Sequence, residues 1–220
     1  MPTPPMPPMP LMPPMPMPPM PTPMPTMMKR DLFVLGELMT VVEVVAKVFV
    51  IKTPQVLGPH VDELCDNNLK VVEPGTWQMK NLRWCDVEGF IGLFYKCMSD
   101  VGASVAEPTK EDFDVNNTSL ADVNKAVGAP GKTTLSYFDV HIDNGGGVSG
   151  QVWTAIVYRD CTAKGGELKI FAEEDGNSPL VAKIACSGMV IMCGDVPHCP
   201  APIEGPGRRD AVIVQLRALP

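Results

Sequence analysis

The chain has 220 residues, of which 45% are hydrophobic and 20% charged, with a formal net charge of −7 and a pI near 4.9. This length and balance are those of one ordinary globular domain with enough apolar residues for a core. An acidic chain lacks the positive surface that binds phosphate backbones, so we expect no nucleic-acid partner.

The apolar and cysteine patterns indicate a cytoplasmic protein. The most apolar run, Leu32 to Ile51, is interrupted by Glu37, Glu43 and Lys47, whereas a membrane span needs about twenty residues with few charges. The N-terminus lacks the basic and apolar regions of a signal peptide. Seven cysteines are scattered without a C-x-x-C pair, which favours reduced, partly buried thiols over a disulfide framework.

The first 28 residues form a biased segment that alternates proline with methionine and holds more than half of the chain's 25 prolines. Proline lacks the backbone donor and fixes φ, so neither helix nor sheet is expected here. We predict a disordered, polyproline-like tail over residues 1–28. Its Pro-x-x-Pro spacings also fit the grooves of SH3 or WW domains, so the tail is a tether or a segment that recruits such a partner.

Residues 29–130 are predicted to form a support of helices and strands. Its apolar runs have helical or β-branched patterns, and its polar stretch near residue 112 is typical of a loop with a helical turn. The elements expected are a helix over Leu32–Ala46, a strand over Val48–Ile51, helices over Pro59–Asn67 and Val87–Met98, and a loop over Asp112–Val127.

From residue 131 on, short β-like runs alternate with glycine and proline turns. Many short strands at even spacing indicate a sandwich or barrel. We therefore predict a mainly β fold with supporting helices (α+β), in which residues 29–220 form one folded domain and residues 131–220 its jelly-roll core. The expected strands are Thr133–Ile142, Val152–Tyr158, Glu167–Phe171, Val181–Ala185, Met189–Cys193 and Ala211–Leu216.

Three residues of this core have the chemistry of a metal site. His141 and Asp143 are two apart, so on a strand they project from the same face. His198 follows much later, and a barrel can bring it to the same point. Two imidazoles and one carboxylate leave further metal positions open and suit iron(II) or zinc, so the residues alone do not fix the metal.

Arg209 is the candidate for binding an acidic co-substrate, with Arg208 as its competitor. Arginine matches a carboxylate with a bidentate, charge-assisted fork. On a strand, Arg209 shares its face with Ala211 and Ile213, which suits a barrel interior. Arg208 shares its face with Asp210 and is expected to meet solvent or pair with that carboxylate.

These residues belong to motifs that follow one another in a definite order. The motifs are His141-x-Asp143-Asn144, Thr154-Ala155-Ile156-Val157-Tyr158, Gly165-Gly166-Glu167-Leu168, Gly194-Asp195-Val196-Pro197-His198 and Arg209-Asp210-Ala211-Val212-Ile213. In this order they resemble the iron(II)- and 2-oxoglutarate-dependent dioxygenases, and within that superfamily the prolyl 4-hydroxylase branch. The resemblance covers about residues 131–217.

The resemblance implies a double-stranded β-helix in which His141, Asp143 and His198 hold iron(II). It also implies that Arg209 binds the distal carboxylate of 2-oxoglutarate, and Tyr137 is a further candidate for contact with this co-substrate. The implied activity couples oxidative decarboxylation of 2-oxoglutarate by O2 to hydroxylation of a C–H bond in a peptidyl or small-molecule substrate. Peptidyl proline is the substrate we predict, and ascorbate is the expected aid that keeps the iron reduced.

Two other functions are compatible with the sequence. One is a non-catalytic jelly-roll scaffold that recruits partners through its proline-rich tail. The other is a cupin-like metal enzyme that binds metal and ignores 2-oxoglutarate.

Overall fold

The computed structural model of the chain describes most residues from Met27 onward. The described residues are 27–68, 72–114, 121–134, 139–144, 151–174 and 178–219. Residues 1–26 of the tail predicted over residues 1–28 therefore lie outside the described part of the chain. The first strand begins at Met28.

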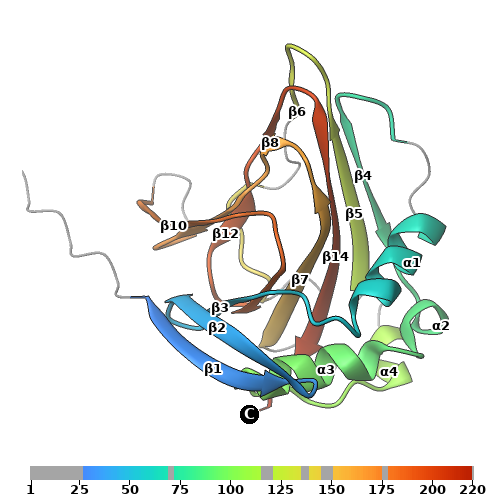
Figure 1. Cartoon of the computed structure of the whole chain (residues 1–220), viewed down its shortest axis with the longest axis vertical. Coiled ribbons are helices and arrows are strands. Elements are labelled where there is room, and N and C mark those ends of the chain that lie inside the picture. Colours follow the sequence, from blue (N-terminus) through green and yellow to red (C-terminus); the bar gives the residue numbers. More distant parts are fainter. Residues whose placement is uncertain are drawn as a thin grey trace, which may run out of the picture.

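The largest element is an antiparallel sheet of eight strands in the order β1-β2-β3-β11-β7-β14-β5-β4 (Figure 1). Strand β11 is buried along its whole length and β7 along most of it, because both faces of the sheet are covered. The strands are β1 Met28–Val34, β2 Glu37–Val45, β3 Val48–Ile51, β4 Thr76–Asn81, β5 Ala121–Gly128, β7 Val152–Cys161, β11 Met189–Cys193 and β14 Gly207–Arg217.

Two three-stranded sheets complete the barrel, one in the order β10-β9-β12 and the other in the order β6-β13-β8. They lie on the side of the main sheet opposite to the helices (Figure 1). This arrangement confirms the mainly β prediction with a jelly-roll core. The strands are β6 Thr133–Thr134, β8 Lys164–Gly165, β9 Leu168–Phe171, β10 Leu180–Ile184, β12 His198–Pro200 and β13 Ile203–Glu204.

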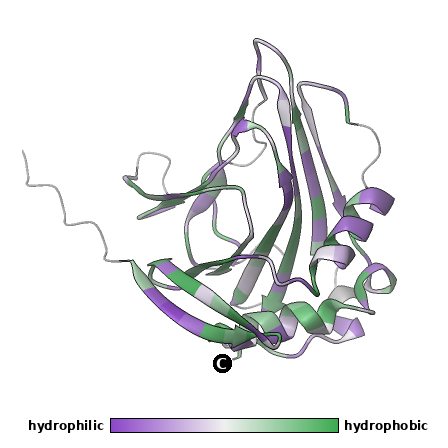
Figure 2. Cartoon of the chain, in the orientation of Figure 1, coloured by the Kyte–Doolittle hydropathy of each residue, from purple (hydrophilic) through white to green (hydrophobic). Residues whose placement is uncertain are grey.

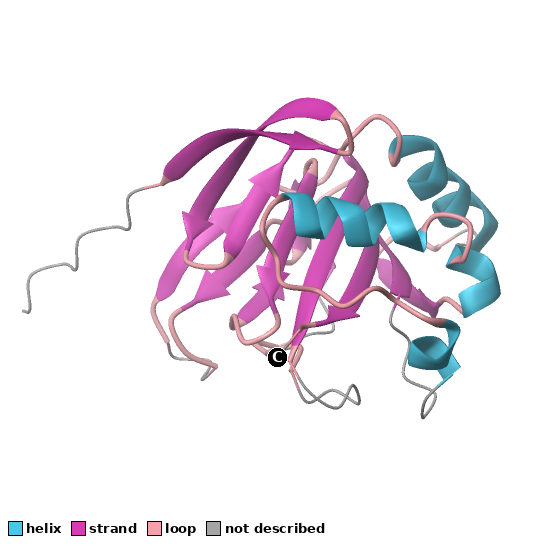
Figure 3. Ribbon diagram, turned by 90° about the horizontal axis from the view of Figure 1, so that it is seen from below, coloured by secondary structure: helices cyan, strands magenta, loops and turns pink. Residues whose placement is uncertain are grey.

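The helices gather on one side of the molecule, as the view from below shows (Figure 3). Hydrophobic residues concentrate in the central strands of the main sheet, whereas α1 is largely hydrophilic (Figure 2). The described helices are all much too short to cross a membrane. They are α1 Gly58–Asn68, α2 Trp84–Val87, α3 Ile91–Asp100 and α4 Lys110–Asp114.

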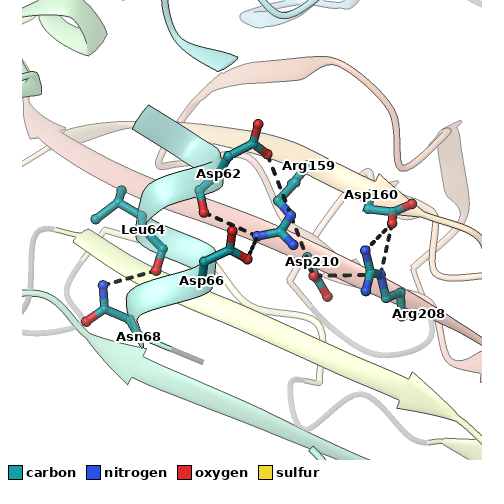
Figure 4. Close-up of polar contacts among 8 residues, drawn as sticks. All are labelled: Asp62, Leu64, Asp66, Asn68, Arg159, Asp160, Arg208 and Asp210. Carbon is teal, nitrogen blue, oxygen red and sulfur yellow. Dashed lines mark hydrogen bonds and ion pairs between the residues drawn. The ribbon is translucent and has the colours of Figure 1, made fainter. Parts of the chain in front are cut away.

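Ion pairs hold α1 against the outer face of the main sheet (Figure 4). The guanidinium of Arg159 on β7 lies 2.6 Å from a carboxylate oxygen of Asp66 and 3.7 Å from one of Asp62. The same guanidinium lies 4.0 Å from Asp210 on β14. On the neighbouring strand Arg208 pairs with Asp160 at 2.5 Å and lies 3.9 Å from Asp210. Arg208 thus faces outward and takes an ionic partner, as strand parity predicts.

The helix predicted over Leu32–Ala46 is wrong, because this segment forms the hairpin β1–β2. Leu35 and Gly36 both have positive φ, 52° and 83°, which is the two-residue turn that matches the twist of antiparallel strands. The apolar residues that suggested helical spacing are spread over two paired strands instead. The strand over Val48–Ile51 and the helix over Pro59–Asn67 are confirmed as β3 and α1.

Two further expectations need correction. The helix expected over Val87–Met98 is interrupted, since α2 ends at Val87 and α3 begins at Ile91. The loop expected over Asp112–Val127 contains β5, which pairs with β4 and β14. Two polar residues of β5, Asp122 and the buried Asn124, face the interior cavity described below.

The expectation of seven reduced cysteines is also wrong, because Cys161 and Cys186 form a disulfide between the end of β7 and the turn after β10. They are 25 residues apart in sequence, and only the folded barrel brings them together. The other five cysteines are free. Burial raises the pKa of Cys65 to about 11 and that of Cys97 to about 12, so both thiols stay protonated.

Candidate metal centre

A cavity of about 240 Å³ lies between the main sheet and the sheet β10-β9-β12. Strands β4, β5, β7 and β14 contribute one wall, and β9 and β12 contribute residues opposite them. The segment 139–144 supplies His141 and Asp143, and β12 begins with His198. All three predicted metal ligands therefore face one enclosed space.

The three ligand atoms lie within 4.8 Å of one another. The distance from Asp143 Oδ1 is 3.7 Å to His141 Nε2 and 3.9 Å to His198 Nε2. Neighbouring ligands of an ion with bonds of about 2.1 Å are roughly 3.0 to 3.4 Å apart, so a slight inward movement of the side chains suffices to bind a metal. The donor set and its spacing fit a divalent transition metal such as iron(II).

Backbone pairing brings the two histidines together from distant parts of the chain. His141 N donates to His198 O at 3.0 Å, and His198 N donates to His141 O at 2.9 Å. Apart from this bridge, His141 is not part of a strand. The described strand that precedes it in the sequence is β6, Thr133–Thr134. Of the strand predicted over Thr133–Ile142, Thr133–Thr134 is confirmed, residues 139–142 form only the single bridge at His141, and residues 135–138 lie outside the described part of the chain.

Both imidazoles are fixed in the tautomer that a metal ligand needs. The Nδ1–H of His141 donates to the carbonyl oxygen of Asp139 at 2.8 Å, and that of His198 donates to Val196 at 2.9 Å. A carbonyl only accepts, so each Nε2 keeps its lone pair for the site. Burial lowers the pKa of His198, and the nearby carboxylate of Asp143 acts in the opposite direction. The lowered pKa favours the neutral imidazole that binds a metal.

Asp143 is oriented by both its side chain and its backbone. Thr154 on β7 donates its hydroxyl to Asp143 Oδ2, which leaves Oδ1 directed toward the histidines. The backbone N–H groups of Asp143 and Asn144 donate to Gly194 O at 2.9 and 3.1 Å. Asn144 Oδ1 in turn accepts from Val152 N at 2.9 Å. A Cβ at Gly194 would lie 2.5 Å from Asn144 Oδ1, so this close approach requires glycine.

Arg209 lies on the cavity wall with Ala211 and Ile213. Its side chain is buried, with 6% of the residue exposed, and burial lowers the pKa of the guanidinium. Nη1 donates to Gly166 O at 3.2 Å. A buried cation that faces a cavity can bind an anion there, because its remaining N–H groups can donate to a carboxylate or a phosphate.

Tyr158 also lines the cavity. Burial raises the pKa of Tyr158 to about 12, and the positive charge of Arg209 acts in the opposite direction. It was not among the predicted site residues, nor was Thr154. The signal was present in the sequence, since Thr154, Ile156 and Tyr158 alternate along one strand and all three face the cavity. Tyr137, the predicted co-substrate contact, lies outside the described residues.

The spacing along β7 sets the size of the ligand that this cavity suits. Thr154 contacts Asp143, and Tyr158 lies four residues further along the same strand beside Arg209. Four residues of strand span about 13 Å between Cα atoms. With side chains extending from both ends, this length leaves room for a short dicarboxylate between the metal ligands and the guanidinium.

No family model and no curated protein matches the chain. A prolyl 4-hydroxylase structure from Phytophthora capsici is 14% identical, with a TM-score of 0.49 over 78% of this chain and 59% of that one. A prolyl hydroxylase from Trichoplax adhaerens, solved in complex with a hypoxia inducible factor oxygen degradation domain peptide fragment, is 15% identical, with a TM-score of 0.46 over 77% of this chain and 83% of that one.

The structure of IDO from Bacillus thuringiensis is also similar, at 17% identity and a TM-score of 0.35 over 46% of this chain. This chain spans about half of that protein, or 48% of its length. The solved structures that the chain is similar to therefore include prolyl hydroxylases, and at these identities the similarity concerns the fold alone.

Proposed function

We propose that the chain is an iron(II)- and 2-oxoglutarate-dependent dioxygenase that hydroxylates a substrate C–H bond, with peptidyl proline as the substrate. The observation that carries the proposal is a single cavity that contains both a two-histidine, one-carboxylate cluster and a buried arginine. A metal site alone fits many enzymes, whereas a buried cation in the same enclosed space calls for an anionic co-substrate.

Iron(II), when bound by His141, Asp143 and His198, supplies the activation of O2 and of the co-substrate. The protein's own contribution is to bind and orient. Thr154 keeps the carboxylate of Asp143 turned toward the histidines, and Arg209 with Tyr158 binds the distal carboxylate of 2-oxoglutarate. The balanced reaction consumes O2, 2-oxoglutarate and the substrate C–H bond and yields succinate, carbon dioxide and the hydroxylated product.

The cavity walls are largely apolar around the polar groups. Ile142, Ile156, Leu168 and Ile213 line the same space as the polar residues. An apolar lining strengthens the interaction of Arg209 with a carboxylate, because the local dielectric is lower than in solution.

The test exploits the fact that the chain has three histidines. Metal binding and iron-dependent succinate formation are measured for the full chain and for His141→Ala, His198→Ala and His60→Ala. His60 stacks on Phe90 at 5.1 Å between ring centroids and is not part of the metal cluster, so it is the matched control. We expect the first two variants to lose metal and succinate formation and the His60 variant to retain both. Metal binding that survives both site substitutions would contradict the proposal.

The substrate is tested separately with proline-containing peptides and matched peptides in which alanine replaces proline. Stimulation of succinate formation by the proline peptides alone, with a gain of one oxygen atom per modified residue, supports a prolyl hydroxylase. Metal binding without any turnover of 2-oxoglutarate favours a non-catalytic barrel instead.

A further inference from the structure

The disulfide lies beside the cavity arginine because of an irregularity in the pairing of β7 with β14. Asp210 is opposite Asp160, whereas Ala211 is opposite Tyr158, so Arg159 is an extra residue on β7. A bulge of this kind changes which residues share a face. Beyond it Cys161 is directly opposite Arg209, and directly opposite residues of an antiparallel pair lie on the same face.

The second sulfur touches the backbone that holds Arg209. Cys186 Sγ lies 3.8 Å from Gly165 O, and a Cβ built at Gly166 would lie 3.7 Å from Cys186 Sγ and 3.5 Å from Arg209 Cδ. The carbonyl of Gly166 accepts the hydrogen bond from Arg209 Nη1 at 3.2 Å. The backbone at Gly165 and Gly166 is therefore close to both the disulfide and the arginine. The disulfide thus reaches Arg209 both through its cross-strand neighbour and through its hydrogen-bond acceptor.

The two glycines of this turn need an external restraint. Gly165 and Gly166 have positive φ of 81° and 77°, and glycine has the widest range of accessible backbone conformations. Gly166 N donates to Pro202 O at 3.0 Å, which fixes the turn on one side. The contact of Cys186 Sγ with Gly165 O, at 3.8 Å, is a second restraint on the turn.

We propose that the Cys161–Cys186 disulfide is a positioning element for Arg209 and makes the affinity of the cavity for its dicarboxylate ligand dependent on thiol redox state. The inference rests on the proposed function, in which that ligand is 2-oxoglutarate. Both cysteines are half-buried, so a small dithiol reaches them. Reduction breaks one S–S bond and yields two thiols on the protein, while the dithiol loses two electrons and two protons and becomes a cyclic disulfide.

The metal ligands are held by different contacts. His141, Asp143 and His198 are fixed through Asp139, Val196, Thr154 and Gly194, none of which belongs to the glycine turn or the disulfide. Reduction is therefore expected to weaken co-substrate binding and leave metal binding unchanged. This separation distinguishes positioning of Arg209 from a general loosening of the barrel.

The test compares the oxidised full chain with the same protein after treatment with a dithiol, which is then removed under argon. Alkylation of the unfolded chain should count five free thiols before reduction and seven after it. The dissociation constant for 2-oxoglutarate is measured with manganese(II) in place of iron(II). We expect it to rise about five- to tenfold on reduction, which is less than the loss of a whole hydrogen bond to a charged group, because Arg209 is displaced and not removed. The KM for 2-oxoglutarate should rise in parallel while kcat and the metal affinity are unchanged.

Two variants control the interpretation. The double variant Cys161→Ser/Cys186→Ser should bind 2-oxoglutarate as weakly as the reduced protein and should not respond to dithiol. Cys85→Ser, which removes an exposed free thiol, should respond as the unaltered chain does. Reduced unaltered protein provides the same comparison without substitution should the double variant fold poorly.

Equal dissociation constants in the two redox states, with binding still lost in Arg209→Met, would overturn the redox inference alone. Absence of 2-oxoglutarate binding in both states would overturn it together with the proposed function. A rise in KM accompanied by an equal loss of metal affinity would also overturn it, because the disulfide would then act on the whole barrel.

Discussion

Arg209→Met is expected to shift folding stability and ligand binding in opposite directions. The arginine is buried, its guanidinium has a lowered pKa because of that burial, and it faces the cavity. Among the described residues its guanidinium donates to Gly166 O, which is a neutral acceptor. Without a bound anion, the folded protein therefore carries a desolvated charge that no carboxylate compensates within hydrogen-bonding distance among the described residues.

The size of both effects follows from this geometry. Methionine has a similar length and fills the same space, so the substitution removes the charge without opening a large cavity. Replacing buried charges by apolar residues of similar volume is often neutral or stabilising by about 1 to 4 kcal/mol. Hydrogen bonds to a charged group contribute about 1.5 to 3 kcal/mol each. Loss of one such interaction weakens 2-oxoglutarate binding roughly 10- to 100-fold, and loss of a bidentate pair weakens it more.

The assay combines urea unfolding of the metal-free protein with titration of 2-oxoglutarate into the manganese(II) form. Arg208→Met is the matched control, because this neighbouring arginine faces outward and pairs with Asp160. Since both of these side chains are about a third exposed or more, the control should lose less than about 1 kcal/mol and bind 2-oxoglutarate normally. A loss of more than about 2 kcal/mol in Arg209→Met, with unchanged ligand affinity, would refute a ligand-binding role for Arg209.

Three other perturbations test the remaining parts of the structure. Thr154→Val removes the hydrogen bond to Asp143 and should weaken metal binding about 10- to 100-fold in a metal titration; unchanged affinity would show that Asp143 needs no such support. Burial raises the pKa of the Asp210 carboxyl above its ordinary value of 3.8 in the folded protein. Protonated Asp210 therefore contributes stability that is complete below pH 3.8 and is lost as the pH rises through the pKa of the folded state. Asp210→Asn should abolish that decline in urea unfolding measured from pH 3.8 upward, and an unaltered pH profile would contradict it. Opening the 25-residue loop in Cys161→Ser/Cys186→Ser should lower the free energy of unfolding by about 3 kcal/mol, and a loss below about 1 kcal/mol would disagree with the loop-closure argument.

Strands that cross the interior of the barrel were predictable from the sequence. β7 and β11 are runs of β-branched and apolar residues that are buried on both faces, and β9 alternates buried with half-buried residues, so each has a clear strand pattern. The hairpin β1–β2 was not, because a two-residue turn at Leu35-Gly36 is a weak signal inside an otherwise continuous apolar segment. The pairing of β2 with β3 favours strands over a helix in this segment.

The metal cluster was predictable as a set of residue types, but the reason for its convergence was not. Strand parity suggested that His141 and Asp143 share a face, yet both lie outside the named strands. They converge because His141 forms a two-bond bridge with His198, and because Gly194 accepts from the backbone of Asp143. The close approach of Gly194 depends on contacts between segments some fifty residues apart, which no local pattern contains.

Parity worked better for β14, where Arg209, Ala211 and Ile213 all face the cavity. It would have failed for Cys161 on the neighbouring strand. Counting from Tyr158 in steps of two leads to Asp160, and the bulge at Arg159 instead places Cys161 opposite Arg209. A one-residue insertion in one strand reverses the faces of everything beyond it. The same bulge turns Asp160 outward, where it pairs with Arg208, and turns Cys161 toward the cavity arginine. One irregular residue therefore assigns the two adjacent arginines their different environments, and it also brings the disulfide to the anion-binding end of the cavity.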